Sequence, residues 1–138
     1  MEEHIVISRM IVVLNHLIRN RTEGKKCLDR DVEQLENMLS LVRSQVMRKH
    51  WEGIVNITLE LVNEHSVSVT FSKIIQEMNS CNVYHLFTLY ALFVDVISFR
   101  VQNNLRVNII YELGELHYVI HSNIGTSVLK SALSAVRS

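Results

Sequence analysis

The sequence predicts an all-helical domain wrapped around one apolar helix. Proline is absent from the 138 residues and glycine occurs four times, whereas sheet-rich domains usually need more of both for their tight turns. Apolar residues recur at steps of three and four along most of the chain, which indicates amphipathic helices. Residues 83–101 are instead apolar on nearly all sides, as in a helix surrounded by others. We therefore expect a bundle of seven to eight helices with residues 83–101 at its centre.

The bulk composition fits a single globular domain that covers residues 1–138. Hydrophobic residues make up 48% of the chain and charged residues 20%, which excludes a disordered chain. Fourteen basic and fourteen acidic residues leave no net charge. Because nucleic-acid binding needs a surplus of Lys and Arg on one face, we expect no nucleic-acid partner.

The first half of the chain contains three amphipathic segments. Residues 3–20 form the first, and a polar segment over residues 20–26 ends it. Residues 29–48 form the second, with Asp29 as the predicted N-cap. One apolar stripe runs along this second segment: Leu35, Leu39, Val42 and Val46. Residues 50–64 form the third segment, whose apolar side carries Trp51, Ile54, Ile57 and Leu61.

A short fourth helix follows a connection that the sequence predicts to be irregular. Residues 66–70 are β-branched and polar, which favours a loop or a short turn. Ser68 or Thr70 is the predicted cap of a helix that continues through Met78. Residues 79–82 form a turn before the central helix.

The remaining segments alternate between helix and turn in the same way. Asn103 and Asn104 mark a break after the central helix. Residues 105–121 form an amphipathic helix, residues 123–125 a turn, and residues 127–136 a final short helix.

Cysteine usage and the apolar segments predict a cytoplasmic protein. Cys27 and Cys81 form neither a metal-ligand spacing nor a disulfide framework, which favours a reducing compartment. The start of the chain is acidic where a signal peptide is basic, so we expect no secretion. The longest apolar stretch, residues 86–99, contains Asp95 and Ser98 and is too short to span a bilayer. Residues 131–138 are small and polar, so we expect no tail anchor.

An enzyme or a metal protein is an alternative that the sequence supports weakly. His117 and His121 lie four residues apart, with Glu112 and Glu115 nearby. Zinc sites need roughly three or four converging ligands, and no His-Glu-x-x-His pattern is present. We expect neither a metal nor a cofactor, and solvated or hydrogen-bonded histidines instead.

Cys81 and His85 could form a nucleophile and its base, but no third group that would orient the base is evident. The chain also has no glycine-rich phosphate loop. We therefore expect no catalytic residues and no enzymatic activity.

Three segments together resemble the Bcl-2 family. Residues 70–78 read Thr-Phe-Ser-Lys-Ile-Ile-Gln-Glu-Met and are similar to the Ser-Phe-x-x-Val-Val-x-Glu-Leu helix of that family. Residues 83–101 stand in the place of the BH1 region and central helix. Residues 111–125 resemble the end of the sixth helix and the Asn-Gly-Gly of the BH2 region. The stripe of residues 29–48 matches the anchor spacing of a BH3 region.

The chain departs from the family pattern at three signatures. The BH1 arginine is missing, because no Lys or Arg occurs between Cys81 and Phe99. Arg43-Ser44 replaces the Gly-Asp pair of a BH3 helix, and no Trp follows Gly125. The loss of these signatures is similar to that in viral pro-survival members of the family. The connection at residues 20–28 also resembles the shortened first loop of those members.

The resemblance implies an inhibitor of apoptosis in a virus-infected host cell. It would sequester BH3 helices of pro-apoptotic proteins, of the Bim or the Bax and Bak type, in an apolar groove, and would reach mitochondria only through such partners. The resemblance implies groove residues in four helices: Val46, His50, Ile54, Ile57, Ile74, Glu77, Met78, His85, Phe87, Leu89 and Tyr90. Any amphipathic helix yields such residues, so their alternative role is plain core packing.

Two hypotheses follow from the substituted signatures. The aspartate of a BH3 ligand is met by His85, another polar group of the rim or water, and fewer ligands bind well as a result. With Arg43-Ser44 in its second helix, this protein receives BH3 helices and does not donate one.

A helical adaptor that self-associates is the competing function. An empty apolar groove is an exposed patch that attracts partners, including a second copy of the chain. A homodimer is therefore compatible with both functions, and saturable binding of BH3 peptides distinguishes them.

Overall fold

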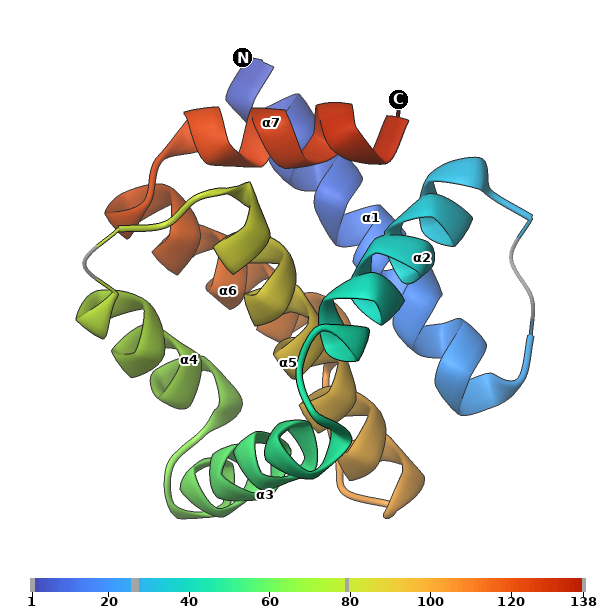
Figure 1. Cartoon of the computed structure of the whole chain (residues 1–138), viewed down its shortest axis with the longest axis vertical. Helices are drawn as coiled ribbons and strands as arrows, with labels where there is room; N and C mark the ends of the chain where they lie inside the picture. The colour runs from blue at the N-terminus through green and yellow to red at the C-terminus, as the bar shows by residue number, and fades with distance from the viewer. Residues whose placement is uncertain (1, 26–27, 79, 138) are drawn as a thin grey trace.

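The computed structural model describes residues 2–25, 28–78 and 80–137, and all regular structure in these ranges is helical. Seven α-helices follow one another without a strand in the described part of the chain, which confirms the predicted all-α class (Figure 1). Their bounds are α1 (Glu2–Glu23), α2 (Arg30–Ser44), α3 (Arg48–Glu64), α4 (Val67–Glu77), α5 (Val83–Gln102), α6 (Ile109–Asn123) and α7 (Thr126–Arg137).

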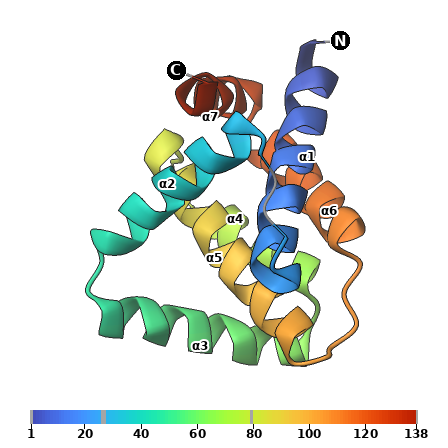
Figure 2. The same cartoon turned by 90° about the vertical axis from the view of Figure 1, so that its right-hand side faces the viewer.

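Helix α5 is the inner helix, as its apolar sequence predicts. It packs against α1, α2, α3 and α7, whereas α4 lies on α6 and α3 (Figures 1 and 2). More than half of its residues are buried. Length and composition alone would let α5 cross a bilayer, but 61% of the relevant window is buried inside the domain. Its hydrophobicity is therefore explained by its position in the core.

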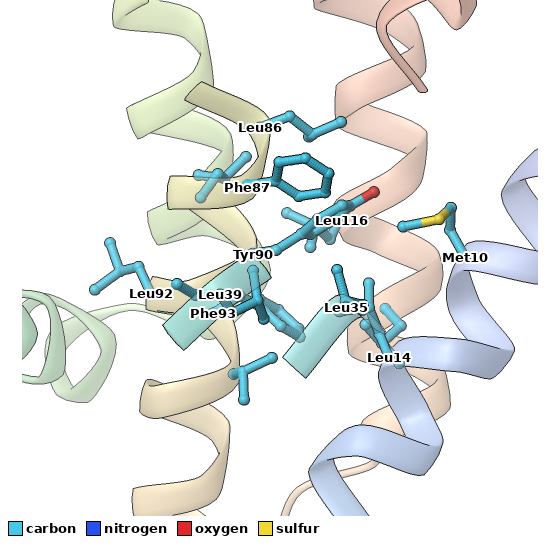
Figure 3. Close-up of a cluster of buried hydrophobic side chains, with 14 of the residues drawn as sticks. Met10, Leu14, Leu35, Leu39, Leu86, Phe87, Tyr90, Leu92, Phe93 and Leu116 are labelled. Atoms are coloured by element: carbon cyan, nitrogen blue, oxygen red, sulfur yellow. The ribbon is translucent and has the colours of Figure 1, made fainter. Parts of the chain in front are cut away.

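The core joins side chains from helices that are distant in sequence. Figure 3 shows Met10 and Leu14 of α1 and Leu35 of α2 beside Tyr90 of α5 and Leu116 of α6. All five are at most 2% exposed. A fully buried side chain of this size contributes about 1.5–3 kcal/mol relative to an exposed one. This cluster thus fixes α5 between α1, α2 and α6.

Several helix ends differ from the prediction because local hydrogen bonds determine them. Helix α1 continues past the predicted break, to Glu23, where Arg19 donates to Glu23 and Thr22 donates to Ile18. Helix α2 is capped by Asp29, as predicted, because that side chain accepts from the Asp31 amide. It ends at Ser44, four residues earlier than predicted.

The connection before α4 was predicted incorrectly. Ser66 is the N-cap, since its Oγ accepts from the amide of Val69, and the helix begins at Val67. Neither Ser68 nor Thr70 therefore caps the helix, and residues 67–70 are not a loop. Residue 79 of the predicted turn lies outside the described residues.

The helix predicted from residue 105 begins at Ile109, because Asn108 caps it by accepting from the amide of Tyr111. Asn104, at the predicted break, adopts a positive φ of 60°. The predicted turn after α6 is present at Gly125, whose φ of +99° suits glycine.

The two ends of the chain are held together by ion pairs. Arg9 of α1 donates to Asp29 and Asp31 at the start of α2, at 2.8 Å each. Arg137 at the end of α7 also contacts Asp31, at 3.4 Å. The Arg9 guanidinium lowers the pKa of the Asp29 carboxyl through its hydrogen bond. Helices α1, α2 and α7 thus meet at one pole of the bundle, where both termini lie (Figure 1).

A fully buried histidine connects α5 to α6. The hydroxyl of Tyr90 lies 2.8 Å from Nε2 of His117, and Nδ1 of His117 lies 2.8 Å from the carbonyl oxygen of Leu113. A carbonyl only accepts, so Nδ1 carries the proton and Nε2 accepts from Tyr90. Burial lowers the pKa of His117 to about 4, so the imidazole is neutral at pH 7.

We expect acid to destabilise the fold through His117. The unfolded chain takes up a proton near the ordinary pKa of 6.5, and the folded chain resists it down to about 4. The contribution of His117 is therefore complete above pH 6.5 and is lost as the pH falls toward 4, by about 2 kcal/mol at pH 5. Urea unfolding at pH 7.5 and pH 5, compared with His117→Gln, measures this loss. An equal loss in both proteins would contradict it.

Candidate functional site

A cleft opens where α2 and α3 diverge from α5. The connection between α2 and α3 is only three residues long, so the chain turns sharply there. The two helices meet at this junction and diverge from it (Figure 2). The cleft has a volume of about 830 Å³. We call it the α5 cleft. Its apolar lining is formed by Val46, Met47, Trp51, Val55 and Phe99, and we call Arg21, Arg43, Asp95 and Ser98 its polar floor. Further polar residues complete the lining: Ser44, Arg48, Glu52, Asn56 and Gln102.

The apolar walls of the α5 cleft expose surface that a soluble domain usually buries. Met47 is 67% exposed and Phe99 is 46% exposed, and both are on its edge. Trp51 is the only tryptophan of the chain and is nearly buried against the floor. Adjacent exposed apolar side chains around a cleft mark a binding surface.

Asp95 is the centre of the polar floor. Its Oδ1 accepts from Arg21 at 2.6 Å and from Arg43 at 2.9 Å, and its Oδ2 accepts from Nε of Arg43 at 3.1 Å and from the indole of Trp51 at 2.8 Å. The donors come from α1, α2 and α3. One carboxylate on α5 therefore holds three other helices at the cleft.

These hydrogen bonds and ion pairs, which we call the Asp95 hub, compensate the charge of a carboxylate that lies mostly buried on the inner helix. The side chain of Asp95 is 14% exposed and that of Arg43 is 17% exposed. A carboxylate at such a depth costs several kcal/mol unless it is paired and hydrogen-bonded. Glu36 approaches Arg43 only at 3.8 Å, so Asp95 is the main partner of Arg43.

Only one of the predicted groove residues, Val46, lines the α5 cleft. His50, Ile54 and Ile57 are exposed on α3. Successive residues of a helix are about 100° apart, so these three side chains lie on the flank of α3 away from Val55 and the cleft. With Leu61 they form what we call the α3 outer stripe, which is 40–61% exposed at its three apolar positions.

The predicted groove residues at α4 and in the first turn of α5 do not line the cleft. Glu77 is exposed at the end of α4, Ile74 is half-buried on α4, and Met78, the C-cap residue, is also half-buried. His85 takes part in a capping box at the start of α5, where its Nδ1 accepts from the amide of Asn82. None of these four residues lines the cleft.

Three predicted groove residues of α5 belong to the core. Phe87, Leu89 and Tyr90 are 7%, 4% and 0% exposed, and Tyr90 is engaged by His117. The open face of α5 instead carries the half-buried or exposed side chains Tyr84, Thr88, Asp95 and Phe99, which recur at helical steps. Leu89 and Tyr90 follow Thr88 and point about 100° and 200° away from that face. Tyr90 in particular offers a ligand no surface in this structure.

The residues considered for metal binding or catalysis are separated in the structure. His117 is buried against Tyr90, whereas His121 lies 3.4 Å from Glu3 at the surface. Over residues 2–25, 28–78 and 80–137, no three His, Cys, Asp or Glu side chains gather as metal ligands. Burial raises the pKa of the Cys81 thiol, which opposes formation of a thiolate nucleophile.

Comparisons with models of protein families, with curated proteins and with solved structures give no match to this chain. The physical features of the α5 cleft therefore carry the functional argument.

The pairing at Asp95 leads to a stability prediction. Asp95→Asn leaves two guanidinium groups without their carboxylate, so we expect the free energy of unfolding to fall by about 2–3 kcal/mol. Urea unfolding followed by circular dichroism measures the change. Glu52→Gln is the matched control, because it breaks only the exposed Arg48–Glu52 pair and should cost less than about 1 kcal/mol. Similar losses in the two variants would show that Asp95 is not the hub.

Proposed function

We propose that this protein binds BH3-type amphipathic helices of pro-apoptotic Bcl-2 proteins in the α5 cleft and thereby inhibits apoptosis in the cytoplasm of a host cell. The observation that carries the proposal is the α5 cleft itself: about 830 Å³, with exposed apolar walls, beside the inner helix of an all-helical bundle. A cleft of this kind is complementary to the apolar stripe of a helix.

The energetics of such a ligand support the proposal. A BH3 helix presents four apolar anchors, and burying each one contributes about 1.5–3 kcal/mol. Ordering a disordered peptide costs about 2–5 kcal/mol or more. Apolar burial against Met47, Val55 and Phe99 therefore supports binding even though α5 has no arginine in its first four turns.

The three segments that resemble the Bcl-2 family coincide with defined elements. Residues 70–78 fall mainly on α4, residues 83–101 on α5, and residues 111–125 on α6 and the turn at Gly125. The order of these elements and the inner position of α5 are what a Bcl-2-type protein requires. The order of the helices and the inner position of α5 therefore support the proposal.

The second helix supports a receiving rather than a donating role. Arg43 on α2 donates twice to Asp95 on α5, and the apolar stripe of α2 is buried in the core, from Val32 to Val42. Release of α2 as a ligand would break these contacts and leave Asp95 without a partner from α2. We therefore propose that α2 stays in the fold while a foreign helix is bound.

A self-associating adaptor is the second candidate function, and the α3 outer stripe favours it. Ile54, Ile57 and Leu61 are exposed at one face of α3, and they do not line the α5 cleft. An adaptor that uses this stripe would dimerise without binding BH3 helices. Ile57→Glu would then abolish concentration-dependent mass in light scattering and would leave the cleft unchanged.

Titration with fluorescent BH3 peptides tests the proposed function. We expect saturable binding with a Kd of about 1 μM or lower, which corresponds to about 8 kcal/mol. Phe99→Glu places a charge in the apolar wall and should weaken binding by about tenfold or more.

The control for this titration is Tyr118→Glu. Tyr118 is also an exposed aromatic residue on a helix, 72% exposed, but it lies on α6 away from the cleft. It should leave the affinity unchanged. Absence of saturable binding by any BH3 peptide, or equal weakening by both variants, would overturn the proposal.

A further inference from the structure

We infer that the floor of the α5 cleft contains a carboxylate-recognition subsite, in which Arg21, Arg43 and Ser98 bind an acidic side chain of the partner helix. The nature of the partner rests on the proposed function, but the preference for an acid rests on the floor alone. No predicted groove residue belongs to this subsite.

The carboxylate already present cannot use all the donors around it. Asp95 receives four hydrogen bonds, two at each oxygen, so its own acceptor capacity is essentially filled. A guanidinium carries five N–H groups. Arg21 uses only Nη1 toward Asp95, and its other N–H groups have no hydrogen-bond partner among the residues that the structure describes.

The charge of the cleft also favours an acid. Arginines outnumber carboxylates in its lining by three to two, since Arg48 and Glu52 pair with each other and Arg21 and Arg43 share Asp95. A second carboxylate at the two shared arginines would restore one acid per base. Guanidinium and carboxylate groups form short, charge-assisted hydrogen bonds, often in pairs.

Ser98 gives an independent indication that the floor is incomplete. It lines the cleft and is 5% exposed, and its Oγ has no hydrogen-bond partner among the described residues. It lies three residues after Asp95, on the same side of α5. Buried hydroxyls are nearly always paired. The Ser98 Oγ is covered in this structure, so a change of side-chain rotamer would bring this unpaired hydroxyl to a ligand acceptor in the cleft.

The walls favour an acid that is joined to an apolar group, as on a peptide. Trp51 and Val55 stand on α3 opposite Phe99 on α5, and all three are apolar at the cleft. A free inorganic anion would bring no apolar surface to cover them. A carboxylate next to a bulky apolar side chain satisfies the floor and the walls together.

Two blocked dipeptides, N-acetyl-Leu-Asp amide and N-acetyl-Leu-Asn amide, test the subsite without relying on BH3 binding. The indole N–H of Trp51 donates to Asp95 at 2.8 Å and belongs to the only tryptophan, so its NMR resonance reports on the floor. We expect the aspartate probe to shift this resonance saturably and the asparagine probe to bind about tenfold more weakly.

Variants of two arginines on α1 complete the test. Arg21→Gln should remove the preference for the aspartate probe, and Arg21→Lys should keep part of it. Arg19→Gln is the matched control, because Arg19 pairs with Glu23 on the surface and does not line the cleft. Circular dichroism establishes that each variant is folded.

The outcomes separate this inference from the proposed function. Equal binding of the two dipeptides, no shift with either, or an unchanged preference in folded Arg21→Gln would overturn the subsite, whatever the BH3 peptides do. If the aspartate preference depends on Arg21 while no BH3 peptide binds, the subsite is supported and the proposed binding of BH3 helices is overturned. If both hold, substituting each acid of the BH3 peptide in turn identifies the residue that Arg21 binds.

Discussion

The fold depends on one carboxylate in its inner helix. Asp95 accepts from Arg21, Arg43 and Trp51, so α1, α2 and α3 are fixed to α5 at the same point. Apolar packing is tolerant of small displacements, whereas four hydrogen bonds with defined directions are not. Asp95 thus sets the position of the α2–α3 junction, and that junction shapes the cleft.

The burial of α5 explains why the open surface lies where it does. It packs against α1, α2, α3 and α7, and the side chains that stay half-buried or exposed include Tyr84, Thr88 and Phe99. Helix α4 lies on α6 and α3. The bundle therefore has a complete core on one side of α5 and a cleft beside the other.

The sequence predicted the helices better than it predicted the cleft. Periodicity located all seven helices, because burying an apolar stripe leaves a direct pattern in the residue order. Their ends moved by several residues where single side chains, such as Ser66 and Asn108, cap the backbone. Such caps compete with neighbouring Ser, Thr and Asn residues that look equally suitable.

The groove residues were harder to predict because their positions depend on rotation of each helix. A shift of one residue moves a side chain by about 100°, and this is the difference between Leu89, which is buried, and Thr88, which faces outward. The sequence did contain one usable signal: Asp95 is the only acidic residue in α5 and Arg43 interrupts the end of α2. A carboxylate in an apolar inner helix predicts a basic partner on a neighbouring helix, because buried charges are paired.

The ion pairs at the start of α2 determine where the ends of the chain lie. They join Arg9 to Asp29 and Asp31, and Arg137 to Asp31. They gather α1, α2 and α7 at the pole that carries both chain ends, whereas α3 closes the opposite pole (Figures 1 and 2). Any tether, fusion or surface attachment at either end would therefore present α3 outward. Two copies linked tail to tail would hold their α3 helices at the far extremities of the assembly.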